Sequence, residues 1–260
     1  MIVHISPYDF DTGLINESER LSNVISATIE RDATDETSLL ESAVVKLDST
    51  SFTKGWYAVD ALVDGSRNRL GVFYFTLSNI EQETDGSMVY ELQGVSVLYN
   101  ASVTNVKGGY SVVQGNSGTA TLESLLACCN TELDIEAFHI AKTQTFNGNV
   151  TNLGAVWSIL RNAGMCMQIT NEGTIKIMQT PTEPIKTITK DGGGLTGTVS
   201  VSDDEVGYEC ELSGRPYDAV DIQLPNFGIQ KTLLIASQSI DLENSLIAEE
   251  TAKEKVYDGE

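Results

Sequence analysis

The chain has 260 residues, with 37 acidic residues against 16 basic ones, so its formal net charge is 16 − 37 = −21. A chain of this length can bury a sizeable core without disulfide staples, and so acidic a balance argues against a groove that grips nucleic-acid phosphates. Hydrophobic residues make up 41% of the chain, which excludes dominant disorder, and its apolar runs are far shorter than the roughly 20 residues of a membrane-spanning helix.

The first part of the chain, residues 1–118, is expected to form a mainly β domain. In 43–48 the apolar Ala43, Val45 and Leu47 alternate with Val44, Lys46 and Asp48, and 56–63 is rich in aromatic and β-branched residues. This second segment ends at Asp64-Gly65, a turn signal, because glycine adopts positive φ without a steric penalty.

Two further strands are expected to pair as a hairpin. They span 70–77 and 88–98, and Asp85-Gly86 between them favours a tight turn. Gly94 lies inside the second strand and predicts a bulge or a bend there.

A small α+β domain is expected over 119–182, because the hydrophobic period changes to that of helices. Thr151 or Asn152 can cap the second helix and Gly164 can end it. Two short strands, 165–170 and 174–178, then flank a tight turn. The first helix carries Leu122, Leu125, Leu126 and Cys129 at i, i+3, i+4 and i+7, and the second carries Leu153, Val156, Trp157 and Leu160 at the same spacing.

After Pro181 the chain is expected to return to β-structure over 183–240 as a second β domain. Residues 241–260 are expected to form a C-terminal helix and tail, because 241–256 is rich in Glu, Ala and Lys. The short strands expected in the second β domain span 199–201, 208–212, 219–224 and 232–236.

The cysteines and histidines give no catalytic or metal motif. Four cysteines, at 128, 129, 166 and 210, lack the paired spacing of zinc ligands and are expected to be reduced, buried small hydrophobes. His4 and His139 lie outside any recognisable acid–base arrangement. We therefore expect no catalytic residues, no cofactor-binding residues, no metal ligands and no enzyme activity.

Three polar segments are candidate binding or catalytic sites, and we interpret each of them as a surface loop. Asp9 and Asp11, before Gly13, resemble the start of a calcium loop, but the later ligands are absent. Asp203-Asp204-Glu205 is more simply a solvated turn, and the glycines at 192–194 have no Lys or Arg soon after them to meet a phosphate.

The aromatic residues of the strands are interpreted as core and cross-strand pairs. A sugar-binding aromatic platform is the alternative for them, whereas Trp157 on the apolar face of its helix is expected in the core. The strand aromatics in question are Tyr57, Phe73, Tyr74, Phe75 and Tyr90.

Taken in order, these pieces resemble the central hub proteins of phage tails and of contractile injection systems. Three stretches carry the resemblance. They are Arg69–Phe75 with Tyr90–Leu98; Gly118-Thr119 leading to Leu125-Leu126; and Asn152-Leu153 through Trp157, Leu160 and Gly164 to the hairpin Ile169–Ile177.

The resemblance implies two tail-tube-like β-barrel domains interleaved with the small two-helix insert. It implies copies that self-associate as a homotrimeric ring, with a tail tube or distal tail protein on one side and a tip or spike protein on the other. The family has no catalytic residues in this part. Its larger relatives carry peptidoglycan-cleaving domains further along, and we expect none within these 260 residues.

The same resemblance implies a place in the virion tail, assembled in the cytoplasm of a host bacterium, with a phage or prophage as the source. DNA would pass through the ring without specific binding, because a lumen lined by carboxylates repels phosphates. No membrane partner is expected.

Other functions remain open at this stage. They are a different tail component, such as a distal tail protein or a tube-like initiator; a carbohydrate-binding adhesin or receptor-binding module of the tail tip; and a carboxylate-dependent glycosidase. The two-helix insert argues against a simple tube protein.

Overall fold

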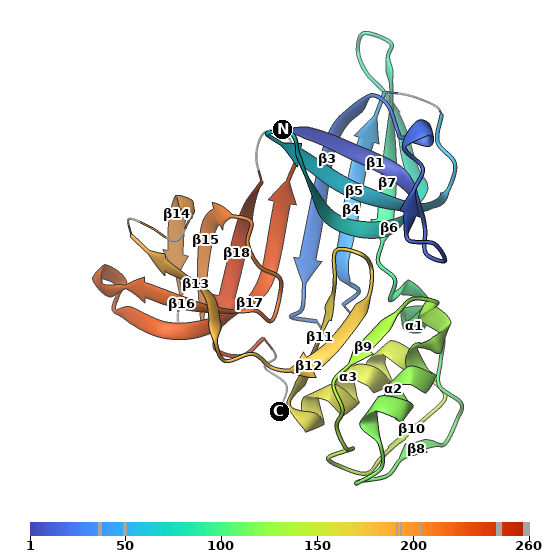
Figure 1. Cartoon of the computed structure of the whole chain (residues 1–260), viewed down its shortest axis with the longest axis vertical. Helices are drawn as coiled ribbons and strands as arrows, with labels where there is room; N and C mark the ends of the chain where they lie inside the picture. The colour runs from blue at the N-terminus through green and yellow to red at the C-terminus, as the bar shows by residue number, and fades with distance from the viewer. Residues whose placement is uncertain are drawn as a thin grey trace.

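The computed structural model shows a mainly β chain with a small helical insert. Figure 1 displays three groups of elements: an N-terminal strand group in blue and cyan, the insert in green and yellow, and a C-terminal strand group in orange and red. The residues described are 1–35, 38–48, 51–190, 192, 194–202, 204–242 and 246–256.

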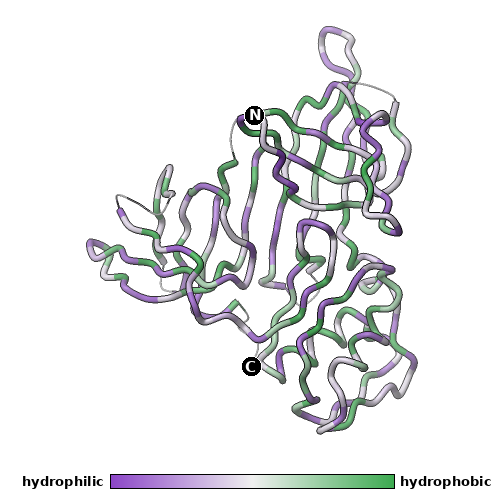
Figure 2. Tube along the Cα trace, in the orientation of Figure 1, coloured by the Kyte–Doolittle hydropathy of each residue, from purple (hydrophilic) through white to green (hydrophobic). Residues whose placement is uncertain are grey.

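The N-terminal strand group is a set of antiparallel neighbours. The expected hairpin of β6 and β7 is confirmed, with Gly86 at φ +88° in its turn. Polar and apolar residues alternate along many of these strands (Figure 2), as expected for sheets with one face in a core. The elements are β1 (Ile2–Asp9), β2 (Leu14–Ile15), the 3-10 helix η1 (Glu17–Glu19), β3 (Val24–Asp32), β4 (Leu40–Leu47), β5 (Gly55–Val63), β6 (Ser66–Gln82) and β7 (Met88–Val95).

The insert contains both expected helices. The hydroxyl of Thr151 accepts a hydrogen bond from the Gly154 amide, and Gly164 ends the helix at φ +67°, so both predicted helix signals are confirmed. Its elements are α1 (Tyr99–Val103), β8 (Tyr110–Val112), α2 (Gly118–Leu126), the 3-10 helix η2 (Ala127–Cys129), β9 (Leu133–Ile135), β10 (Gln144–Phe146), α3 (Asn152–Ala163), β11 (Met165–Ile169) and β12 (Ile175–Gln179).

The C-terminal strand group is organised around one long strand, β17. The first half of β17 pairs with β16, and its second half lies between β18 and β3. The elements are β13 (Pro184–Thr189), β14 (Leu195–Val201), β15 (Glu205–Glu211), β16 (Ala219–Leu224), the 3-10 helix η3 (Pro225–Phe227), β17 (Ile229–Asp241) and β18 (Ile247–Lys253).

The pairing of β17 with β3 joins the two strand groups into one sheet of 13 strands. Its main path runs β14-β15-β18-β17-β3-β4-β7-β6-β5-β1-β2, with β16 and β13 attached beside β17. Among the described strands this path has two free ends and closes no barrel. The mainly β class with an α+β insert is therefore confirmed, whereas two separate barrels are not observed.

Two local expectations are wrong. The helix expected over 241–256 is instead the end of β17 and the strand β18, which is hydrogen-bonded to β15 on one side and β17 on the other. Gly94 makes no bulge, since its register is continuous with both neighbouring strands. A Cβ at Gly94 would lie 2.6 Å from the Phe75 ring, so close aromatic packing explains the glycine.

The hydrophobic cores cross the boundaries between these groups. The largest cluster combines insert residues such as Trp157 with Leu40 of β4 and Ala236 of β17. A second cluster combines N-terminal strands with Ile240 and Ala248 of β17 and β18. The domain limits 1–118, 119–182, 183–240 and 241–260 stay a prediction, although α1 and β8 contact insert elements.

Candidate functional site: a buried charged row at the junction

A row of polar side chains crosses the sheet where the two strand groups meet. Direct cross-strand partners place Glu250 of β18 beside Gln238 of β17, Gln238 beside Arg31 of β3, and Arg31 beside Glu41 of β4. All four residues are at most 3% exposed. We call these four residues the junction row. Directly opposite residues lie close enough for their side chains to meet.

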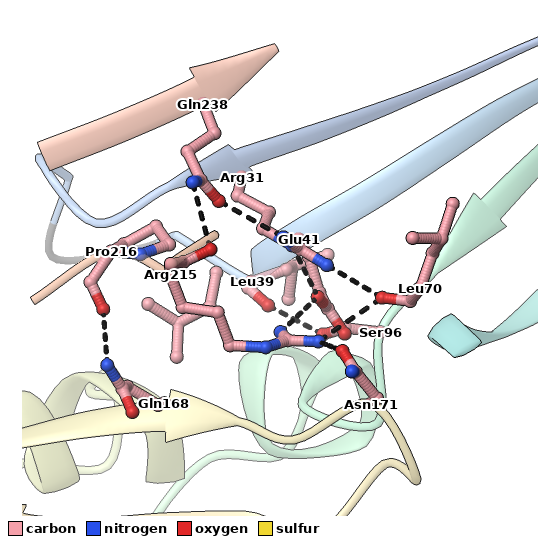
Figure 3. Close-up of polar contacts among 12 residues, drawn as sticks. Arg31, Leu39, Glu41, Leu70, Ser96, Gln168, Asn171, Arg215, Pro216 and Gln238 are labelled. Atoms are coloured by element: carbon pink, nitrogen blue, oxygen red, sulfur yellow. Dashed lines mark hydrogen bonds and ion pairs between the residues drawn. The ribbon is translucent and has the colours of Figure 1, made fainter. Parts of the chain in front are cut away.

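The contacts within the junction row form a continuous chain, and Figure 3 shows its part from Gln238 through Arg31 to Glu41. Arg31 Nε lies 3.4 Å from Glu41 Oε2, and Arg31 Nη1 donates to Gln238 Oε1 at 3.1 Å. Gln238 Nε2 donates to Glu250 Oε1 at 2.8 Å. Lys186 of β13 donates to the other oxygen of Glu250 at 2.9 Å. Each charge of the row therefore has an opposite charge within reach.

Arg215 connects the junction row to the insert. Its guanidinium donates to Glu41 Oε2 at 3.1 Å, to the Leu70 carbonyl of β6 at 3.2 Å, and to the side chain of Asn171 in the β11–β12 turn. Arg31 donates to the same Leu70 carbonyl at 2.7 Å. The Leu70 carbonyl of β6 and the Glu41 carboxylate of β4 thus join Arg31 of β3 to Arg215, and Arg215 itself makes the link to the insert turn (Figure 3).

Burial makes this arrangement electrostatically demanding. Desolvation, reinforced by the neighbouring positive charge of Arg215, lowers the pKa of Arg31 to about 10, so Arg31 stays charged at neutral pH. Glu41 Oε1 is buried and has no hydrogen-bond partner among the residues that the structure describes. Buried ion pairs stabilise a fold little over apolar packing, but they penalise a shifted register, because a slip of one residue would reverse every side chain.

A cavity of about 480 Å³ opens beside the junction row, and we call it the junction cavity. Four of the chain's six arginines line it, two of them from the start of β6. Its lining residues are Arg31, Arg67, Asn68, Arg69, Leu70, Asn171, Leu212, Ser213, Gly214, Arg215, Asp218 and Leu246.

The histidines lie apart from the junction row. The His4 ring contacts the Arg20 guanidinium at 2.8 Å, and burial together with the charge of Arg20 lowers the pKa of His4. His139 is exposed and forms an isolated bridge with Ser117.

The cysteines are free, and Cys129, Cys166 and Cys210 are buried, as the sequence predicts, while Cys128 is half-buried. Burial raises the pKa of Cys129 and Cys166 to about 12 and that of Cys210 to about 11, so these thiols are poor nucleophiles. Lys186 Nζ lies 3.2 Å from the Cys210 sulfur.

The polar segments weighed from the sequence form turns and strand ends. Asp9 accepts the Asp11 amide within the turn before Gly13. Glu205 belongs to β15 and pairs with Lys253 at 3.2 Å. Asp203 and Gly193 lie outside the described residues. Within the part of the chain that the structure describes, no three His, Cys, Asp or Glu side chains gather so as to hold a metal ion.

The strand aromatics are core residues, as expected, where the interior is deepest. Phe73, Phe75 and Trp157 are almost fully buried, and Tyr57 packs edge-on to Phe75 with ring centroids 6.1 Å apart. Tyr74 and Tyr90 are half-buried. The Tyr74 ring packs against the Trp56 ring, so these aromatic side chains contact other aromatic residues of the same chain.

Sequence reasoning missed the junction row, although a signal was present. Arg31 continues the inward-facing phase of Ala27 and Ile29, and Glu41 shares the phase of Ala43 and Val45. A charge at an apolar phase of a strand indicates either a misassigned strand or a buried ion pair. The partner across the sheet could not be identified, because β17 is some 200 residues away in sequence.

The fold belongs to a class already seen in solved structures. No model of a known protein family matches this sequence, and no curated protein matches it. Several solved structures nevertheless share its architecture over nearly the whole chain. Among the described residues, no helix has the length and apolar character needed to cross a membrane.

Three solved structures illustrate the likeness. The tail protein from Neisseria meningitidis MC58 has a TM-score of 0.68 at 10% identity, covering 98% of each chain. The 43 kDa tail protein of prophage MuSo2 from Shewanella oneidensis has a TM-score of 0.66 at 9% identity, covering 96% of this chain and 95% of that one. Prophage tail protein gp18 from Listeria monocytogenes EGD-e has a TM-score of 0.55 at 10% identity, covering 98% and 95%.

Proposed function

We propose that this chain is a structural hub protein of a phage-type tail, which oligomerises into a ring joining the tail tube to the tip or spike. The observation that carries the proposal is the whole-length likeness to three proteins described as tail proteins. A likeness confined to one module would support only a shared building block, whereas this one includes both strand groups and the insert.

Two features of the chain support assembly as its task. The sheet path ends at β14 and β2, and β13 pairs only with β16 among the described strands. Edge strands present unpaired backbone groups, which a neighbouring subunit can complete. We infer that the barrel-like collar, and with it a homotrimeric ring, arises only when copies meet.

The charge of −21 fits a conduit for DNA. Carboxylates facing a lumen repel phosphates, so a duplex would pass without being held. The junction row supports the proposed function in a structural way. It holds the two strand groups and the insert in one orientation, which a ring subunit needs. A non-enzymatic role follows from the same proposal.

The test is to locate the chain in tail particles of a phage or prophage that encodes it. A gold-labelled antibody against the chain is expected at the tip end of the tube, and deletion of the gene is expected to leave tubes without tips or no tubes. Particles that are complete without the chain would overturn the proposal. Labelling of peripheral fibres, together with binding on a glycan array, would instead support a carbohydrate-binding adhesin.

A further inference from the structure

The junction cavity gathers four of the chain's six arginines, each of which is also paired with an acid outside the cavity lining. Arg31, Arg67, Arg69 and Arg215 line it, against a single lining carboxylate, Asp218. Arg31, in the junction row, and Arg215, beside it, both form ion pairs with Glu41. Of the two from β6, Arg67 is the most exposed of the four at 39%, whereas Arg69 is 13% exposed, so Arg67 is the arginine that an incoming group meets first.

The two arginines of β6 are held by acids that are themselves exposed. Arg67, with 39% of its side chain exposed, donates to Glu17, and Arg69 donates to Glu172 at 2.7 Å, while both also face the buried Asp60. The side chains of Glu17 and Glu172 are 47% and 60% exposed. An incoming carboxylate can replace either acid without stranding a buried charge, and each guanidinium has five N–H donors to offer.

An extended acidic segment lies elsewhere on the same chain. Residues 78–90, which we call the hairpin arm, extend β6 and β7 beyond the sheet and project from the top of Figure 1. The hairpin arm contains Glu81, Glu83 and Asp85 and no Lys or Arg. Residues 78–88 are all exposed.

The tip of the hairpin arm presents two carboxylates, Glu83 and Asp85, to solvent. Hydrogen bonds from Ser87 lower the pKa of Asp85 and fix its carboxylate at the tip. Glu83 and Asp85 have no salt bridge among the residues that the structure describes. Six extended residues span about 20 Å, so the hairpin arm can reach well beyond its own subunit.

We propose that the hairpin arm of one copy docks its carboxylates in the junction cavity of the next copy. The two surfaces differ and lie apart on the chain, so the contact is heterologous, and repetition of such a contact closes a ring or extends a filament. The inference rests on the proposed function, because it names the contact through which copies of the chain would form the ring.

The experiment is sedimentation velocity on the purified full chain over a range of concentrations at low salt. The arm variant carries Glu83→Lys and Asp85→Lys, and the cavity variant carries Arg67→Glu. Combining all three changes restores opposite charges between the tip of the hairpin arm and position 67, with the signs of that pair exchanged. Glu123→Lys on α2 and Arg20→Glu near β1 are matched controls, because both residues are exposed and lie outside the two surfaces. Circular dichroism verifies that each variant folds.

Wild type is expected to associate, and to do so less as NaCl rises, because screening weakens exposed charge pairs. The arm and cavity variants are each expected to raise the dissociation constant by on the order of tenfold. The combined variant is expected to return within about threefold of wild type, and the controls to stay there.

A monomer at every concentration, or association that the arm and cavity variants leave unchanged, would overturn the inference. Failure of the combined variant to recover would do the same. The labelling of tail particles is read separately, so a chain that occupies the tail tip but associates independently of the hairpin arm removes this contact and retains the hub.

Discussion

Glu41 is the residue on which the junction depends most directly. One of its oxygens accepts from both Arg31 and Arg215, while the other is buried without a partner. Two guanidiniums thus share one carboxylate that is almost fully buried. Replacing a buried ion pair with apolar groups is often tolerated, but removing one member leaves an uncompensated charge in the interior.

Glu41→Ala is expected to lower the free energy of unfolding by about 3–5 kcal/mol, because it removes the carboxylate partner of the buried Arg31 and of the half-buried Arg215. Urea unfolding followed by circular dichroism measures this loss. The exposed Glu123→Ala is the control and is expected to change stability by about 0.5 kcal/mol or less. The triple change Arg31→Met, Glu41→Leu and Arg215→Met is expected to recover most of the loss. Equal losses in Glu41→Ala and Glu123→Ala would contradict this account.

Cys166 gives a pH dependence with a definite sign. Burial, with a smaller contribution from Asp218, raises the pKa of its thiol from 9.0 to about 12. Above pH 9.0 the unfolded chain releases this proton while the folded protein keeps it. The thiol's contribution to stability is therefore complete below pH 9.0 and is lost as the pH rises toward about 12.

Replacing Cys166 with alanine is expected to make stability less sensitive to pH in this window. The slope of unfolding free energy against pH should become shallower by up to about 1.4 kcal/mol per pH unit. Urea titrations of wild type and variant at a series of alkaline pH values measure the two slopes, and the offset from the lost sulfur cancels. Parallel slopes would show that the thiol is not shielded in the folded protein.

At the scale of elements, short sequence motifs predicted the helices and hairpins that are determined by interactions within a few residues. The helix from Asn152 to Ala163 could be predicted from its apolar spacing, its Thr151 cap and its Gly164 stop, all of which act within a few residues. The β6–β7 hairpin could be predicted from Asp85-Gly86 for the same reason.

Strand β18 could not be predicted, because its alternation is hidden. Its buried residues are Ala248, Glu250 and Ala252. The two alanines favour helices, and the buried residue between them is charged. The strand exists because β15 and β17 supply hydrogen bonds on both sides. The junction row was missed for a related reason, since its members come together only through pairing between β3 and β17.

Gly94 tests how an element adapts to aromatic packing. Gly94→Ala is expected to destabilise the protein by about 1–3 kcal/mol, because its Cβ would overlap the Phe75 ring. Gly55→Ala in β5 is a matched control: the nearest atom to its Cβ is 3.9 Å away, and we expect a change of about 1 kcal/mol or less. Thermal or urea unfolding compares the two. Equal effects would mean that strand propensity, and not the ring, sets the requirement at Gly94.

At the scale of the whole molecule, the three groups of elements share their interior. The cluster around Trp157 in the insert includes Ala33 and Leu40 near the N-terminal strands and Ala236 and Val256 of the C-terminal region. Removing any one group would expose apolar surface on the others. In the proposed ring, a force applied at one group would be transmitted through this shared interior to the other two.

We therefore expect the chain to unfold in one cooperative transition. The two tryptophans report on different groups: Trp56 lies in β5 of the N-terminal group and Trp157 in α3 of the insert. Trp56→Phe leaves the insert reporter, and Trp157→Phe leaves the other. In each variant the midpoint of urea unfolding by fluorescence is expected to equal the midpoint by far-UV circular dichroism. Comparing both probes within one variant removes any effect of the substitution on stability. A fluorescence midpoint for Trp157 well below that of the backbone signal would mean that the insert unfolds by itself, and that the junction row does not couple it to the sheet.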